Sequence, residues 1–127
     1  MSLQDAAKET VDYLLFVDEA PIVGDVRGSV PFADTFAAGG PRDRKGRTLR
    51  QLDLQRRLMR YPCSYMIYAP QFDALPRRAK EAIYERMWQI LSGREQAAKY
   101  QRFTRDDRRA IIEILRDTKK DLPSYFK

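Results

Sequence analysis

The sequence predicts an all-α domain with about four main helices, one or two short helices, and a long irregular loop between the first and second main helices. Apolar residues recur at three- and four-residue spacing in four segments, which is typical of helices that bury one face. No segment alternates apolar and polar residues as a half-buried strand does. The 127 residues, 43% of them hydrophobic, suffice for one core, so we predict that residues 1–127 form a single helical domain.

The first main helix is expected over residues 3–19, between a candidate N-cap at Ser2 and the helix-breaking Pro21. Its C-terminal part, residues 13–17, is apolar on every side, so we expect this helix to be covered on several faces. Residues 20–47 then carry five glycines and three prolines, and this composition predicts the long irregular loop.

A short helix is predicted inside this loop, over residues 29–39, because Pro31 stands early in the segment and Gly39 follows its end. The proline- and aromatic-rich stretch 61–76 is expected to be a rigid, partly buried turn region with a helical turn at 63–68. The other main helices have recognisable residues at their first turns, Thr48, Pro76 and Thr104, and cover residues 48–60, 76–92 and 104–119.

The net charge of +6 is concentrated in one segment of the chain. Residues 41–60 contain seven Arg and one Lys against two Asp, whereas the other 107 residues carry sixteen basic and sixteen acidic side chains. Guanidinium groups favour planar, bidentate pairing with carboxylate or phosphate, so this segment suits a localised anionic partner better than diffuse attraction. The residues that we expect to bind this partner are Arg42, Arg44, Lys45, Arg47, Arg56, Arg57 and Arg60.

The partner of this Arg-rich segment is open at this stage. The arginines either remain solvated or pair inside the fold with Asp12, Asp18 and Glu19, or they bind an anionic ligand, an acidic protein surface or the upstream region of the same protein, or they bind nucleic acid. Nucleic acid is disfavoured because the sequence carries no helix-turn-helix, zinc knuckle or β-sheet RNA platform.

Several chemistries are excluded by the residue types that the chain lacks. It contains no histidine, which removes His-dependent nucleophile systems, His-ligated metals and the attachment motif of c-type haem. We therefore predict no metal site, no cofactor and no catalytic residue. The single cysteine, Cys63, is interpreted as a buried structural residue, with a reactive thiol beside Arg60 as the alternative. No stretch is long and apolar enough to span a membrane, and no secretory signal is recognised.

Three stretches of the chain carry a resemblance: YLLFVDEAP at residues 13–21, GPRDRKGRTLRQLDL at 40–54 and RYPCSYMIYAPQFDALP at 60–76. Together with SYF at 124–126, they resemble the C-terminal part of a group of larger, uncharacterised bacterial proteins that look exported. The resemblance implies a bacterial source, a missing N-terminal region and a periplasmic setting, and it supplies no functional residue. Residues 1–3 are typical of a start added for expression.

These observations favour a non-enzymatic helical interaction domain at the C-terminal end of a longer protein. Such a domain docks an acidic partner, or its own upstream region, through the Arg-rich segment. One alternative is a part of an enzyme or redox protein whose active centre lies mainly in the missing region, and another is a nucleic-acid-binding domain. The direction of the arginine head groups distinguishes an internal scaffold from a binding site.

Overall fold

The computed structural model describes residues 2–17, 38–51 and 59–126, and in these ranges the protein is all-α, as the sequence predicts. The described residues form four α-helices, three of them with 12 or more residues, and three short 3-10 helices, without a strand. In chain order the elements are α1 (Leu3–Leu14), η2 (Tyr65–Tyr68), α3 (Pro70–Asp73), α4 (Arg77–Leu91), η3 (Ala98–Tyr100), α5 (Arg105–Thr118) and η4 (Ser124–Phe126). The short helix predicted over 29–39 and the middle of the helix predicted over 48–60 lie almost entirely outside the described residues.

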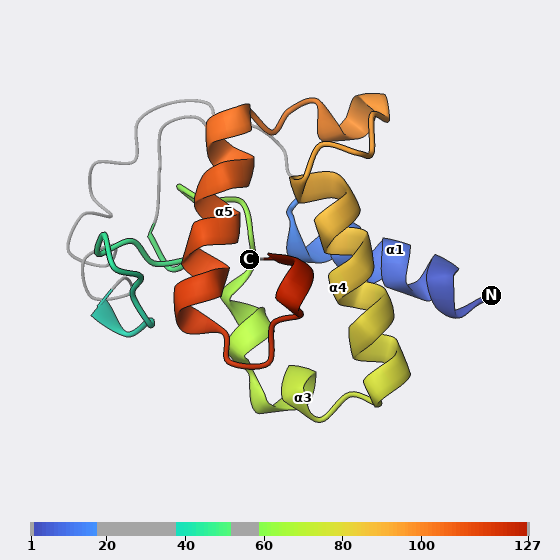
Figure 1. Ribbon diagram of the computed structural model, residues 1–127, viewed down its shortest axis with the longest axis horizontal. Coiled ribbons are helices and arrows are strands. Elements are labelled where there is room, and N and C mark those ends of the chain that lie inside the picture. The colour runs from blue at the N-terminus through green and yellow to red at the C-terminus, as the bar shows by residue number, and fades with distance from the viewer. Residues whose placement is uncertain (1, 18–37, 52–58, 127) are drawn as a thin grey trace, which may run out of the picture.

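Helix α4 contacts both α1 and α5, and the C-terminal η4 lies between α4 and α5 (Figure 1). Phe126 of η4 is fully buried, and its ring centre lies 5.1 Å from that of Trp88 and 6.1 Å from that of Tyr84, both on α4. These aromatic contacts lock the end of the chain into the core. Helix α5 is thereby held against α4 along one flank.

Helix α1 begins at its predicted cap but ends earlier than predicted. Ser2 and Asp5 form a capping box, in which the side chain of each residue accepts a hydrogen bond from the backbone N–H of the other. The helix ends at Leu14 rather than at residue 19, because Phe16 adopts a left-handed φ of +55°. The N–H groups after the last turn bend back onto helical carbonyls, which is the usual way for a left-handed residue to end a helix.

Because α1 ends at Leu14, the apolar residues 13–17 do not all lie on the helix. Leu15 and Val17 are buried, but Tyr13 is 78% exposed, so the expectation that this helix is covered on several faces is wrong. Arg102, in the segment before α5, donates hydrogen bonds to the carbonyl oxygens of Phe16 and Val17, at 3.0 and 2.6 Å. A side chain from a distant part of the chain therefore satisfies the carbonyl end of α1.

Helices α4 and α5 agree closely with the bounds predicted for them. Helix α4 starts directly after Pro76 and is followed by Gly93 at φ +85°, while Thr104 caps α5 by accepting a hydrogen bond from the N–H of Asp107 at 2.9 Å. Their buried side chains recur at helical spacing and are Ile83, Tyr84, Met87, Ile90 and Leu91 on α4 and Ala110, Ile111, Ile114 and Leu115 on α5.

The stretch 61–76 forms the compact turn region that the sequence predicts. Ser64 caps η2 with its side chain, and its backbone N–H donates to the carbonyl oxygen of Leu14 at 2.7 Å, which ties this region to α1. Phe72 of α3 is buried, and its ring centre lies 5.7 Å from that of Tyr84 on α4. The region thus connects α1 to α4 through the core.

The prediction of a main helix over residues 48–60 is wrong at both ends of this range, which are the parts that the structure describes. Residues 48–51 form a turn, and the N–H of Arg60 donates to the carbonyl oxygen of Gln51 at 2.8 Å. A continuous α-helix over this interval would hold those two groups about 13 Å apart. Leu49 is nevertheless fully buried, so the apolar spacing that suggested a helix marks a core contact made from a turn.

Candidate interaction site

The basic loop over residues 42–47 is organised by a buried carboxylate. The side chain of Asp43 has no exposed surface, and its Oδ1 accepts hydrogen bonds from the backbone N–H groups of Lys45 and Arg47, at 3.0 and 2.7 Å. The backbone closes a tight turn between Asp43 and Arg47, with Gly46 at φ +80° where the turn requires a left-handed residue. The loop is therefore held in one defined shape.

Arg47 joins this loop to α5. Its guanidinium group contacts the carboxylate of Asp43 at 2.6 and 2.7 Å and that of Glu113 at 2.9 Å, and its side chain is only 18% exposed. Burial by itself would raise the pKa of Asp43, but the hydrogen bonds and charge of Arg47 outweigh burial and hold that pKa below its usual value. The pKa of Glu113 is lowered chiefly by its hydrogen bond from Arg47. Arg47 is thus a structural cation.

The neighbouring cations also meet α5, but at the surface. The backbone N–H of Arg44 donates to Asp117 at 2.9 Å, its guanidinium group lies 3.3 Å from the same carboxylate, and Lys45 Nζ lies 3.5 Å from Glu113. The side chains of Arg44 and Lys45 are 91% and 67% exposed, so these ion pairs contribute little stability. Arg42 donates to a backbone carbonyl within its own loop at 2.8 Å.

The carboxylates that receive these cations differ from those that the sequence suggested. Asp12 accepts hydrogen bonds from Lys99 at 2.9 Å and from Tyr100 at 2.6 Å, which ties α1 to η3 instead of to the basic loop. Asp18 and Glu19 lie outside the described residues. The internal pairing considered for the Arg-rich segment is therefore found for its loop half, with carboxylates of α5 as the partners.

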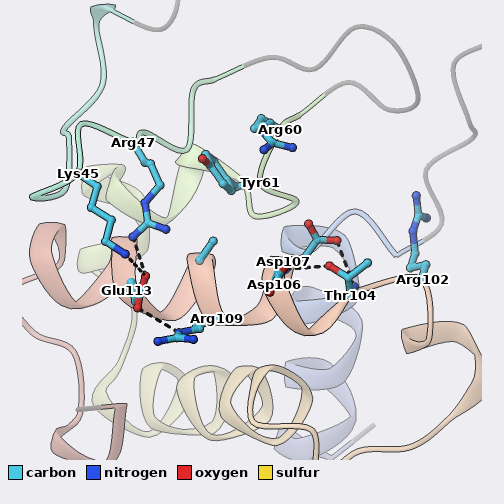
Figure 2. Close-up of a pocket in the computed structure, with 11 residues that line it drawn as sticks. Lys45, Arg47, Arg60, Tyr61, Arg102, Thr104, Asp106, Asp107, Arg109 and Glu113 are labelled. Carbon is cyan, nitrogen blue, oxygen red and sulfur yellow. Dashed lines mark hydrogen bonds and ion pairs between the residues drawn. The ribbon is translucent and has the colours of Figure 1, made fainter.

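The structure brings Lys45, Arg47 and Arg60 to one side of an open groove of about 810 Å³, with α5 on the other side (Figure 2). In Figure 2, Lys45 and Arg47 reach toward Glu113, and Tyr61 lies between these cations and the first turn of α5. Arg60 is exposed, and its guanidinium carbon lies 5.6 Å from the ring centre of Tyr61. The two other predicted binding residues, Arg56 and Arg57, lie outside the described residues.

Positive charge predominates in this groove. Arg102 and Arg109 line it together with the three cations already named, against the carboxylates of Asp106, Asp107 and Glu113. Asp107 is engaged in the capping box of α5, and Glu113 already binds Arg47 and Lys45. The groove therefore suits a ligand that offers carboxylates to its basic edge.

Reasoning from sequence missed Arg102, Arg109 and Glu113 as parts of this site. Glu113 lies 66 residues from Arg47 along the chain, and no local pattern connects them. The only available signal was the spacing of Arg109 and Glu113, which predicts a pair on one helix face. The structure contains that pair, at 3.4 Å, but gives Glu113 additional partners from the basic loop.

Cys63 lies in the core rather than in the groove. Its exposure is 0%, and burial raises the pKa of the thiol to about 12, which keeps it protonated at neutral pH. This environment agrees with the structural interpretation of Cys63. Within the described ranges, no group of three or more Cys, Asp or Glu side chains could hold a metal ion. Among the helices of the same ranges, none is long and apolar enough to cross a membrane.

The fold and the groove define an all-α domain with a basic groove along one helix. No protein-family model, curated protein or solved structure matches the chain.

Proposed function

We propose that the protein is a non-catalytic interaction domain that binds an acidic protein surface in the groove between the basic loop and α5. The observation that carries this proposal is the convergence of Lys45, Arg60 and Arg109 on one open groove from three separate parts of the chain. The acidic surface belongs either to another protein or to the upstream region that the resemblance implies.

The basic edge of this groove is formed before any partner arrives. Asp43, Arg47 and Glu113 hold the loop against α5, so a partner does not have to order it, and binding costs less conformational entropy. The exposed cations Lys45 and Arg109 contact Glu113 at 3.5 and 3.4 Å. A carboxylate of the partner can share or replace such exposed pairs at little cost in free energy.

The arrangement of signs favours a protein partner over nucleic acid. Asp106, Asp107 and Glu113 line the same groove as the cations. A phosphodiester backbone carries negative charge only, so these carboxylates would repel it. A protein surface that is mainly acidic but also carries basic side chains can complement both signs.

Fluorescence anisotropy of a labelled oligo-glutamate peptide tests this proposal. The K45Q/R60Q variant removes two cations from the groove, and R78Q/R94Q is the matched control, because it removes two exposed arginines that do not line the groove. We expect K45Q/R60Q to weaken binding by about 1 kcal/mol, or about fivefold, at low salt, and R78Q/R94Q to have little effect.

Three results would contradict the proposal. Absence of peptide binding at low salt would remove its basis. Equal weakening in K45Q/R60Q and R78Q/R94Q would mean that net charge, and not the groove, attracts the peptide. Tighter binding of a labelled oligothymidylate than of the peptide would favour the nucleic-acid alternative.

A further inference from the structure

A second groove, of about 570 Å³, lies between α4 and α5, and we propose that it binds an acidic peptide segment that carries a large apolar side chain. Its apolar lining comes from Trp88 and Leu91 of α4 and Ile112 of α5. Its charged lining consists mainly of arginines of α5, two of which are Arg105 and Arg108. The two grooves share Arg109 and Glu113, but Trp88, Arg105 and Arg108 line only the second one, so substitutions at these residues distinguish the two sites.

Two of the arginines that line this groove, Arg105 and Arg108, lack the partners that the basic loop has among the described residues. Within the described part of the chain, no hydrogen bond or ion pair involves the side chains of Arg105 and Arg108. Arg108 is partly buried, and no carboxylate among the described residues pairs with its guanidinium group. Glu113 is the single acidic residue among the described residues that line the groove, and Arg47 already binds it. Carboxylates of a partner would offset this uncompensated charge.

Next to this groove, the space between α4 and α5 is filled by the chain's own η4 segment. Phe126 is fully buried with its ring centre 5.1 Å from that of Trp88, and the ring centre of Tyr125 lies 6.0 Å from Trp88. Arg116 of α5, which also lines the open groove, donates a hydrogen bond to the carbonyl oxygen of Phe126. The chain therefore already places an aromatic side chain against Trp88 and a backbone carbonyl against an arginine between α4 and α5. The open groove beside this segment offers a peptide the same aromatic and arginine contacts.

A peptide fits this combination better than a nucleic acid does. Arg108 and Arg109 lie one helical turn before Ile112 on α5, so cationic and apolar side chains are neighbours in this groove. Such a mixed lining complements the mixed side chains of a peptide, whereas a phosphodiester strand presents uniform charge. The groove is therefore complementary to a peptide in which acidic residues flank one large apolar side chain.

Trp88 is the only tryptophan of the chain, so its fluorescence reports directly on this groove. The probe is a synthetic peptide without tryptophan, in which glutamates flank a single phenylalanine. We expect a saturable change in Trp88 emission on titration. A peptide with alanine in place of the phenylalanine should bind about tenfold more weakly, because it loses most of the buried apolar surface.

Protein variants separate this site from the first groove. R105Q/R108Q should bind the phenylalanine peptide about tenfold more weakly, while R78Q/R94Q and K45Q/R60Q should bind it with unchanged affinity. Among the described residues, the side chains of Arg105 and Arg108 make no hydrogen bond or ion pair, so the fold of R105Q/R108Q should persist, and circular dichroism checks this. R105Q alone, at an exposed position, supplies the same comparison if the double variant does not fold.

Four results would overturn the proposal. These are an unsaturable or absent change in Trp88 emission, equal affinity for the phenylalanine and alanine peptides, and a loss in K45Q/R60Q as large as in R105Q/R108Q. The fourth is an equal or stronger Trp88 response to an oligothymidylate or to vesicles of anionic lipid, which would assign the groove to nucleic acid or to a membrane surface instead.

Discussion

Replacing Asp43 with asparagine tests whether a buried carboxylate fixes the basic loop against α5. The side chain of Asp43 has no exposed surface and accepts hydrogen bonds from two backbone N–H groups and from the Arg47 guanidinium. Asparagine keeps the shape and one acceptor oxygen but removes the charge that faces Arg47. Breaking a buried ion pair costs about 3–5 kcal/mol, and we expect about 2–3 kcal/mol here because Arg47 is 18% exposed and retains Glu113.

The pH dependence of this loss follows from the lowered pKa of Asp43 in the folded state. A carboxyl group with a lowered folded pKa contributes stability that is complete above its unfolded pKa, about 3.9, and is lost as the pH falls through the folded pKa. The stability difference between the wild type and D43N should therefore be full at about pH 7, begin to shrink as the pH approaches the unfolded pKa of about 3.9, and disappear below the lowered folded pKa.

Urea unfolding followed by far-UV circular dichroism at several pH values measures this difference. E85Q is the control, because Glu85 is an exposed carboxylate on α4, and its replacement should change stability by less than about 0.5 kcal/mol. A loss for D43N below about 0.5 kcal/mol at neutral pH would refute the structural role of Asp43. A difference that does not shrink as the pH falls below the unfolded pKa of about 3.9 would refute its electrostatic origin.

Three other perturbations test the core and the end of α1. Replacing Arg102 with alanine removes the donor to the carbonyls of Phe16 and Val17 and should cost about 1–3 kcal/mol in urea unfolding; a negligible loss would contradict its capping role. Cys63, buried and with its pKa raised to about 12, should resist a thiol reagent until urea unfolds the protein, so rapid native labelling would contradict its placement. Phe126→Ala should lower the free energy of unfolding by about 3–5 kcal/mol, and Tyr125→Ala, at a residue that is 38% exposed, should lower it clearly less. Equal losses would contradict the role of Phe126 in holding η4 in the core.

The features that sequence reasoning predicted well depend on contacts between close neighbours in the chain. The cap at Ser2 with Asp5 and the cap at Thr104 each involve residues three positions apart. The bounds of α4 follow from Pro76 and from Gly93, whose backbone preferences act locally. Such features are readable without knowledge of the rest of the fold.

The predictions that failed depend on distant contacts. The segment that contains Leu49 has apolar residues at helical spacing, yet its described ends are joined by a hydrogen bond and Leu49 enters the core from a turn. Helix α1 ends early at Phe16, a residue with no special preference for a left-handed φ, where Arg102 binds the terminal carbonyls from 86 residues away. Burial and long-range hydrogen bonds override the local pattern in both places.

Local sequence patterns suffice for the all-α class, for the helix caps at Ser2 and Thr104 and for the concentration of basic charge in one segment. The distribution of that charge in space depends on the tertiary fold. The fold pairs Arg47 with Asp43 and with Glu113 of α5, and within the described ranges it gives the side chains of Arg105 and Arg108 no hydrogen bond or ion pair. The physical reason is that ion pairing depends on distance and burial in space, and the order of residues along the chain specifies neither.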